Sequence, residues 1–482
     1  RVPVNKLTFE IWKKYSKSKT REDYLFPRTS TGKSIYNEKV NKNIKVMVGL
    51  DIGTTKIACF VGRRNEHGKI QILSMGKAES TGVMRGVVSN IERTIQTIKE
   101  AVELAQARAG GRLTINSVNV GIAGQHIKSL QTRGIHMRKG ASGEISQEDI
   151  NALINDMYAT VMSPGEEIIT VLPQEYIVDN EQGIKDPIGM AGVRLEANFH
   201  LITGHVANVT NIRKCVERAD LSIDEIILEP LASADAVLSA EEKEAGVVLV
   251  DIGGGTTDVA IFYEGIIRHT AVIPFGGNAV TEDIREGCSV MKNTAEALKI
   301  KFGSALADEN KEEEIISIQG LRGREPKEVS VKNLALVIQA RMEEILEQVK
   351  YEIQSSGYEK KIRAGAGIVI TGGGAQLKHI TQLVEYVTGI DSRVGYPNEH
   401  LAKTNTDAIK SPMYSTSIGL VIKGLQDIEL KNVKAPLPNA LGKVAPKDDL
   451  ATREVSQRGG FLNNIKINLA NVLMPNDDKD FL

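Results

Sequence analysis

Apolar positions follow two different periods along this chain. Runs rich in valine and isoleucine predict buried strands, at 44–62 (a pair joined by a turn), 117–122, 246–251, 258–263 and 367–371. Elsewhere apolar residues return every three or four positions, which predicts helices at about 89–108, 206–220 and 333–355. Ser89 and Glu92 have the spacing of a capping box at the first helix. This alternation predicts an α/β fold, with helices layered on mostly buried sheets.

The pattern changes near residue 429. Proline and polar residues predict a flexible linker over 429–458, and an amphipathic helix over 459–475 follows, ended by Pro475. At about 100° per residue, six apolar side chains of this helix fall within an arc of about 120°: Phe461, Leu462, Ile465, Leu469, Val472 and Leu473. A narrow apolar face after a linker favours insertion into a membrane surface, and docking on the protein body or a partner is the alternative.

Composition and charge narrow the possible partners and location. The first 43 residues hold 11 basic residues against 4 acidic ones, which predicts a basic, disordered N-terminal extension or, alternatively, a polybasic membrane contact. The whole chain is balanced, with 60 Lys and Arg against 61 Asp and Glu, so we expect no nucleic-acid partner. Three distant cysteines favour a reducing compartment, and no apolar run is long enough to span a bilayer. We therefore expect a cytoplasmic protein.

One segment occurs twice. Residues 49–60, GLDIGTTKIACF, recur at 249–262 as LVDIGGGTTDVAIF, and both copies are typical of a strand, a turn and a strand. Glycines in such a turn let backbone N–H groups approach phosphate oxygens, and threonine hydroxyls add donors. One copy is weak evidence, because tight turns use Gly and Thr for structural reasons. Two copies predict two homologous halves that clamp one nucleotide, through Gly53, Thr54, Thr55, Lys56, Gly253, Gly254, Gly255, Thr256 and Thr257.

Acidic residues at strand ends add candidate chemistry. Asp51 and Asp251 each end a strand of the repeat, and we expect them to hold a hydrated Mg²⁺ between them. Glu229 ends another strand and begins a helix, where a carboxylate is favourable but not by itself catalytic. Together they are placed to organise metal and water, so Glu229 and Asp251 are the candidate catalytic residues. Any hydrolysis should be slow.

Two further segments predict contacts to the rest of a nucleotide. Gly372, Gly373 and Gly374 follow a strand, where a glycine turn lets the backbone approach a flat adenosine. Glu296 and Lys299 lie three positions apart on a predicted helix and therefore share a face. Alone, such a pair is usually a solvated surface pair.

These segments, in this order, resemble the actin-like ATPase superfamily. The resemblance implies the actin-like two-lobed ATPase fold (duplicated ribonuclease-H-like domains), with ATP and Mg²⁺ as cofactors. It makes 49–60 and 249–262 the phosphate hairpins and 371–375 the adenosine loop, with connectors between the lobes at 227–238 and 415–424. Glu296 and Lys299 become the ribose and adenine contacts.

Within the superfamily the chain is similar to the FtsA family of cell-division proteins, over about 44–428 and again at the C-terminus. The similarity is carried by Val171–Tyr176, 183–187, 192–195, Phe199–Thr203 and Ile267–Thr270. It implies an FtsA-type inserted subdomain, 1C. The expected division is 1A at 44–124 and 204–244, 1C at 125–203, 2A at 245–286 and 365–428, and 2B at 287–364.

The resemblance also implies a function. Members of the FtsA family bind ATP, polymerise head-to-tail, anchor the FtsZ ring to the cytoplasmic face of the inner membrane at the division septum, and recruit later division proteins through 1C. The C-terminal peptide of FtsZ binds 2B, where Arg324 and Lys327 are expected contacts unless they are simply solvated cations. Lys466 is almost the only basic residue of the terminal helix, so we expect polymer avidity to strengthen a weak anchor. The alternatives are a small-molecule kinase of this fold, a chaperone or another actin-like filament protein.

Overall fold

A computed structural model describes residues 46–110, 113–138, 143–318, 325–398, 400–402 and 407–433. The basic extension at 1–43, Arg324 and the amphipathic helix at 459–475 lie outside these described residues. In the part that is described, no helix is both long enough and apolar enough to cross a bilayer.

The first lobe is built on a five-stranded sheet in the order β11-β6-β1-β2-β3. The strand β1 pairs antiparallel with β2 and parallel with β6, while β2–β3 is antiparallel and β6–β11 is parallel. The strand bounds are β1 Met47–Ile52, β2 Lys56–Arg64, β3 Ile70–Glu79, β6 Ser117–Ile122 and β11 Ser222–Leu228. The helices α2 (Ile91–Arg108) and α4 (Val206–Glu217) pack together beside this sheet.

The second lobe repeats this plan. Its sheet has the order β18-β17-β12-β13-β14, and each pair has the same parallel or antiparallel sense as its counterpart in the first lobe. The bounds are β12 Val247–Ile252, β13 Thr257–Tyr263, β14 Ile266–Ile273, β17 Gly367–Thr371 and β18 Ser392–Val394. The predicted duplication is therefore a duplication of a whole α/β topology, and both central strands are buried as their apolar composition predicts.

Helices and short elements complete the second lobe and its junction with the first. The helices are α5 Glu229–Val237, α6 Ala240–Ala245, α7 Gly277–Gly287, α8 Lys292–Phe302, α9 Val331–Ser355, α10 Glu359–Ala364, α11 Ile380–Thr388 and α12 Ser415–Val433. The short elements are β15 Ile315–Ile318, β16 Lys327–Ser330 and the 3₁₀ turns η4 Gly374–Gln376, η5 Asp407–Lys410 and η6 Pro412–Tyr414. The helix α12 continues to Val433, so the linker predicted from residue 429 begins too early.

The first helix starts one residue later than its predicted cap. The N-cap of α2 is Asn90, whose side chain accepts a hydrogen bond from the Arg93 amide at 3.0 Å. Ser89 instead donates from its hydroxyl to the Gly82 carbonyl at 3.0 Å. The capping box predicted at Ser89 is therefore wrong, because closing the preceding hairpin uses that hydroxyl.

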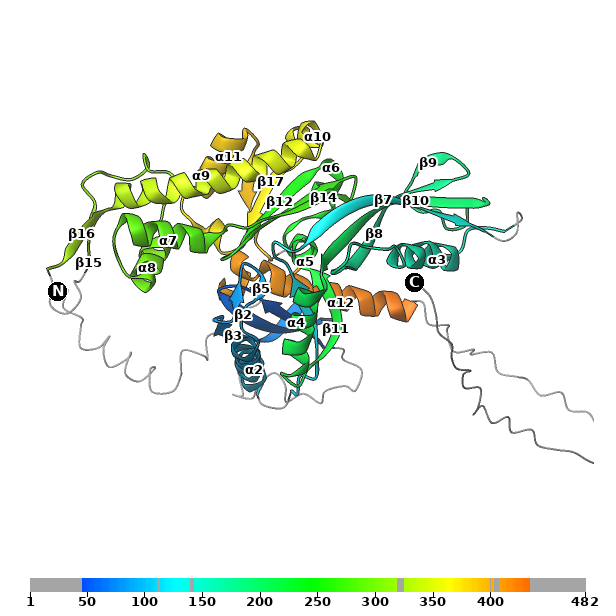
Figure 1. Cartoon of the computed structure of the whole chain (residues 1–482), viewed down its shortest axis with the longest axis horizontal. Coiled ribbons are helices and arrows are strands. Elements are labelled where there is room, and N and C mark those ends of the chain that lie inside the picture. Colours follow the sequence, from blue (N-terminus) through cyan, green and yellow to red (C-terminus); the bar gives the residue numbers. More distant parts are fainter. Residues whose placement is uncertain are drawn as a thin grey trace, which may run out of the picture. The chain divides into compact units, whose positions relative to one another are not determined.

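The two helices α5 and α12 pack against each other where the lobes meet (Figure 1). Their backbones touch at Gly419, where a Cβ would stand 1.8 Å from the Ala232 carbonyl oxygen. Glycine also lets α12 lie directly on β1, because a Cβ at Gly49 would meet Leu420 at 2.8 Å. Glycines therefore set how closely these elements approach.

An inserted domain separates β6 from α4. Its antiparallel sheet has the order β7-β10-β8-β9, with bounds β7 Lys128–Met137, β8 Glu166–Val178, β9 Glu181–Ile184 and β10 Arg194–His205. The helix α3 (Gln147–Tyr158) covers one face, over a core that includes Leu195, Phe199 and Leu201. The polar neighbours His200 and Glu196 alternate with these residues and point to the other face, as strand geometry requires.

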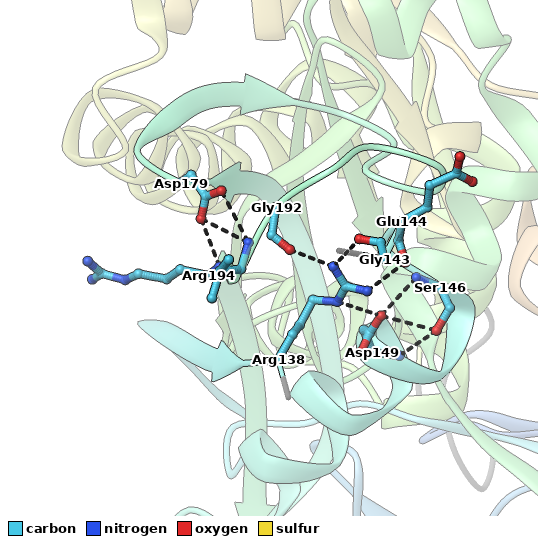
Figure 2. Close-up of polar contacts among 9 residues, drawn as sticks. Arg138, Gly143, Glu144, Ser146, Asp149, Asp179, Gly192 and Arg194 are labelled. Atoms are coloured by element: carbon cyan, nitrogen blue, oxygen red, sulfur yellow. Dashed lines mark hydrogen bonds and ion pairs between the residues drawn. The ribbon is translucent and has the colours of Figure 1, made fainter. Parts of the chain in front are cut away.

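Arg138 holds the far end of this inserted domain together (Figure 2). Its guanidinium donates to the carbonyls of Gly143 at 2.8 Å and Gly192 at 2.5 Å, and its Nε donates to Asp149 at 3.0 Å. Nearby, Asp179 Oδ1 accepts a hydrogen bond from the backbone amide of Arg194 at 2.8 Å. One side chain that is only 10% exposed thus ties two loops to the start of α3.

The polar face of the inserted sheet packs on the edge strand β14 of the second lobe (Figure 1). Gln174 donates to the Ile267 carbonyl at 2.8 Å, and Gln131 donates to the Arg268 carbonyl at 3.1 Å. The buried ring of His200 lies 3.1 Å from the Thr270 hydroxyl. Side-chain amides therefore cover carbonyls that an edge strand otherwise leaves unpaired.

Candidate functional site

A cavity of about 450 Å³ lies between the tips of the two repeated hairpins. Its size is in the usual range for small-molecule and cofactor pockets. It brings together all but one of the residues predicted from sequence for the nucleotide site: Asp51, Gly53, Thr54, Thr55, Lys56, Glu229, Asp251, Gly253, Gly254, Gly255, Thr256, Glu296, Lys299, Gly372, Gly373 and Gly374.

Thr257 is the exception among the predicted phosphate contacts. It does not line the cavity, and its hydroxyl donates to the Phe275 carbonyl at 2.9 Å. Successive side chains of a strand point to opposite faces, so Thr256 and Asp258 face the cavity while Thr257 faces the core. The prediction of Thr257 as a phosphate contact is therefore wrong.

The two hairpins close in the same way and touch at their tips. The Gly53 amide donates to the Lys56 carbonyl at 3.0 Å, and the Gly253 amide donates to the Thr256 carbonyl at 2.9 Å. A Cβ at Gly254 would stand 2.3 Å from the Thr55 methyl group. Gly254 and Gly255 take the places that Thr54 and Thr55 have in the first copy. Their lack of side chains makes room for those threonines, which puts both turns beside the same space.

The two helices between the lobes hold the aspartates that end the central strands. The Ser417 hydroxyl of α12 donates to Asp51 Oδ2 at 2.9 Å. The Ser233 hydroxyl of α5 donates to Asp251 Oδ2 at 2.7 Å, and Thr416 donates to the same oxygen at 3.3 Å. Among the described residues these bonds all go to Oδ2, so the Oδ1 atom of each aspartate is left for other ligands.

Negative charge dominates the cavity floor. Burial, with Asp51, Asp258 and Asp251 close by, raises the pKa of Glu229 well above its usual range. Burial also raises the pKa of Asp251. Burial by itself would lower the pKa of Lys56, but the charges of Asp51, Asp251 and Glu229 raise it above its ordinary value. The cluster therefore favours an added cation.

Asp258 also lines the cavity, although the sequence motifs do not predict it as a site residue. Burial and the charge of Asp251 raise its pKa to about 8, and its Oδ1 is buried without a hydrogen-bond partner in the described chain. A signal was present: Asp258 follows the two threonines of the second copy as Lys56 does in the first, and the strand register places it at the position of Ala58, directly across from Asp251. Cross-strand partners share a face of a sheet, so this carboxyl had to face the cavity too.

The donor set fits a magnesium ion only with help from a ligand. Within the described residues, no group of three or more His, Cys, Asp or Glu side chains is arranged to hold a metal ion. Asp51 and Asp251 offer one carboxylate from each lobe. Mg²⁺ is typically bound by one or two carboxylates, with substrate phosphates and waters filling its other positions. The site is therefore compatible with a metal–phosphate complex rather than with a free ion.

The helix α8 and the glycine turn after β17 form another part of the wall. Lys299 Nζ lies 2.7 Å from Glu296 Oε2 and donates to the Gly277 carbonyl at 2.9 Å. This pair is therefore fixed at the cavity rather than solvated. Gly372 has a φ of 83°, and a Cβ there would stand 2.4 Å from Asp251 Oδ1. Only glycine fits that turn.

Lys327 lies away from this cavity. It begins β16, and its ammonium group donates to the Cys288 carbonyl at the C-terminal end of α7. A lysine there satisfies a free helix carbonyl, which is a structural role that the sequence did not indicate. The expected contact of Lys327 with an acidic peptide stays a prediction.

Two α/β halves of one topology, with a cavity between their matching hairpins, define this protein as a member of the actin-like class. One solved structure, a PilM–PilN type IV pilus biogenesis complex, matches with a TM-score of 0.58 and 15% identity, covering 79% of this chain and 98% of that one. At this identity the likeness shows the fold alone.

The chain belongs to the FtsA family of cell division proteins. It is 43% identical to cell division protein FtsA of Pseudomonas aeruginosa, over 79% of this chain and 90% of that protein. It is 41% identical to that of Neisseria meningitidis serogroup B, covering 77% and 88%, and 36% identical to that of Escherichia coli strain K12, covering 79% and 90%. The family profile for cell division protein FtsA matches residues 248–419, and the profile for the SHS2 domain inserted in FtsA matches 124–203.

Proposed function

We propose that this protein binds ATP with Mg²⁺ in the cavity between its lobes, polymerises, and anchors the FtsZ ring to the cytoplasmic face of the inner membrane at the septum. The observation that carries the proposal is the pair of matching hairpins, one from each lobe, that meet at one cavity beside Asp51 and Asp251. Membership of the FtsA family supports the cell-division role.

Different residues of the cavity are suited to bind the phosphates and the metal ion. Backbone amides of the two hairpin turns and the hydroxyls of Thr54, Thr55 and Thr256 are placed to bind phosphate oxygens. A Mg²⁺ ion at Asp51 and Asp251 would neutralise phosphate charge. Because Ser417 and Ser233 orient these aspartates from helices between the lobes, binding at the cavity would favour one relative angle of the lobes.

Hydrolysis, if the protein performs it, falls to Glu229 and Asp251, with Asp258 as a third candidate. Burial and the neighbouring carboxyl groups raise the pKa of Glu229 well above its usual range, so this carboxyl is suited to hold a proton. A carboxyl that holds its proton must lose it before it can accept one from water, which agrees with a slow reaction.

The remaining parts of the proposal follow the predicted subdomains. We assign 1A and 2A to the two repeated sheets, 1C to the inserted domain, and 2B to the segment 287–364. In this proposal 1C recruits later division proteins and contacts the next protomer, and 2B binds the FtsZ C-terminal peptide, with Arg324 and Lys327 as candidate contacts. The apolar face Phe461–Leu473 is the membrane anchor.

Two measurements test the proposal. The first is binding of ATP to the full chain with Mg²⁺, in the wild type and in Asp51→Ala. We expect at least tenfold weaker binding in the variant, because a buried charged contact contributes about 1.5–3 kcal/mol. Unchanged affinity in Asp51→Ala would remove its metal role. Phosphoryl transfer from ATP to a sugar or carboxylate would instead favour the kinase alternative.

The second measurement is co-sedimentation with liposomes, with and without ATP, for the full chain and for a chain that ends at Val455. We expect ATP to enhance pelleting of the full chain and the truncated chain to stay in the supernatant. If both chains stay in the supernatant with ATP present, the anchoring role is wrong.

A further inference from the structure

A small hairpin of the first lobe, at residues 83–88, reaches the cavity at the end where the turns of the two repeated hairpins lie, which is called here the hairpin-turn end. Its strands β4 (Val83–Met84) and β5 (Val87–Val88) are antiparallel and are joined by Arg85 and Gly86. Val83 and Val88 are buried in the core of the first lobe, which fixes both strands.

The base of this hairpin is fixed as well. The amides of Ser89 and Asn90 both donate to the Gly82 carbonyl, at 2.8 and 3.0 Å. Asn90 is at the same time the N-cap of α2, so the hairpin continues directly into a helix of the lobe. Its tip is therefore held by packing and hydrogen bonds at both ends.

Arg85 adopts a backbone conformation that is unfavourable for an arginine. Its φ is 48° and that of Gly86 is 73°, and two positive values in a two-residue hairpin are the mark of a type I′ turn. Such turns favour Asn, Asp or Gly at both positions. Strain kept at one residue beside a binding cavity points to a function of its side chain.

The tip touches both phosphate hairpins. The Gly86 amide donates to the Thr54 hydroxyl at 3.2 Å, and Gly86 itself lines the cavity. The Arg85 Cα stands 3.0 Å from the place of a Cβ on Gly255, across the gap between the lobes. Arg85 thus starts beside one turn of each lobe, at the hairpin-turn end of the cavity.

At this end of the cavity Lys56 is already paired, because its Nζ lies 3.4 Å from Asp51 Oδ2, and Glu229, Asp251 and Asp258 also line the wall. Within the described chain no carboxylate, carbonyl or ring holds the exposed guanidinium of Arg85. A planar guanidinium is well suited to bind two phosphate oxygens at once.

We propose that Arg85 binds the terminal phosphate of the nucleotide and so makes the site discriminate a nucleoside triphosphate from a diphosphate. The inference rests on the proposed ATP binding, because the phosphates are placed at the two hairpin turns on that proposal. The strained turn carries a cation beside the end of the cavity that is furthest from α8 and the glycine turn after β17.

The test compares ATP and ADP affinities, both with Mg²⁺, by titration calorimetry on the full chain. The variants are Arg85→Gly and Arg85→Lys, and Arg213→Ala is the control because Arg213 is an exposed arginine of α4, a helix that contributes no residue to the cavity wall. We expect Arg85→Gly to weaken ATP binding about tenfold to a hundredfold, as loss of a charged hydrogen bond would, with ADP changed less than about twofold. Arg85→Lys should retain part of the preference, and Arg213→Ala all of it.

Stability without nucleotide gives a second, independent readout. Arg85→Gly should raise the urea midpoint, because glycine adopts the turn without strain. A merely structural arginine would give the opposite sign. An ATP-to-ADP affinity ratio in Arg85→Gly equal to that of the wild type overturns the inference while leaving ATP binding intact. A wild-type chain that binds neither nucleotide overturns the proposed ATP binding itself.

Discussion

Replacing Gly419 by alanine tests whether the contact between α5 and α12 has the geometry described. In a helix this change alone should stabilise, by roughly 1 kcal/mol, because alanine is the better helix former. Here the new Cβ would stand 1.8 Å from the Ala232 carbonyl oxygen and 2.3 Å from the carbonyl carbon. Both obstacles are backbone atoms of a helix, which cannot turn aside as a flexible side chain does.

The cost follows from the distance that must be gained. Real Cβ contacts are essentially never closer than 3.0 Å, so the helices must separate by at least the difference between 3.0 and 1.8 Å. Ile418, Leu420 and Val421 of α12 are fully buried, and a shift of that size loosens their packing. Overpacking of this kind costs about 1–3 kcal/mol and occasionally more. Since the obstacle is rigid, we expect about 3 kcal/mol of strain and a net loss of about 2 kcal/mol.

The assay is urea unfolding of the full chain, with Gly287→Ala as the matched control. Gly287 ends α7, and a Cβ there would meet only methyl groups of Val337, at 3.3 and 3.9 Å. The control should therefore be neutral or slightly stabilising. If Gly419→Ala has the same unfolding free energy as Gly287→Ala, the close approach of α5 and α12 is not a property of the folded protein.

Three further predictions concern single side chains. Arg138→Lys should speed hydrogen exchange of the backbone amides at 143–146 and 187–193, which mass spectrometry measures. The reason is that a lysine ammonium group cannot contact three carbonyls and Asp149 together. Exchange rates equal to those of the wild type would contradict this. Asp258 has a pKa of about 8 in the fold against an ordinary 3.8, so stability should fall as pH rises from about 4 to 8, by at most about 1.4 kcal/mol per pH unit. Asp258→Asn should reduce this slope in urea titrations at pH 5 and 8, leaving the part due to Glu229 and Asp251, and an unchanged slope would show that Asp258 is not buried as described. Burial lowers the pKa of His200 and that of His126 to about 4. The unfolded chain therefore binds protons more readily at these two histidines, so the stability of the fold should fall as pH falls from about 6.5 to 4. His200→Gln should reduce that acid loss, and a variant with the full wild-type loss would show that His200 is not buried as described.

Most of the fold could be predicted because its sheets are buried on both faces. Valine and isoleucine runs mark β1, β12 and β17 directly, and the repeated hairpin reveals that the two lobes share one topology. The residues at which the helices begin and end were harder to predict from the sequence. The α2 cap is misplaced by one residue because both Ser89 and Asn90 are good caps, and the choice between them depends on the hairpin before the helix. That hairpin is a tertiary feature, which local spacing does not encode.

The predictable part of the site is the part that lies within the repeat. A glycine turn between two apolar strands signals its own geometry, so the hairpin residues other than Thr257 fall at the cavity. Ser233, Thr416 and Ser417 could not be found in this way, because serine and threonine hydroxyls in helices usually face solvent or bond to the local backbone. Only the packing of α5 and α12 on the central strands brings them to Asp51 and Asp251.

The contacts between the lobes also limit how the lobes can move. The helices α5 and α12 meet at backbone distance beside the cavity, while Gln174 and His200 hold the inserted domain on β14 of the second lobe. A rotation about the helices that opens the cavity must therefore either break the bonds on β14 or carry the inserted domain with the second lobe. Breaking them would exchange the bonds on β14 for bonds to water, at a net cost of about 0.5–1.5 kcal/mol for each. The second course needs bending where the insertion leaves the first lobe, near Gly124, whose φ is 122°. It must also loosen Ile127 and Ile202, which are buried in the hydrophobic core of the first lobe. The inserted domain is thus held to both lobes, by apolar packing on the first and by hydrogen bonds on β14 of the second, and either rotation has to break one of these contacts.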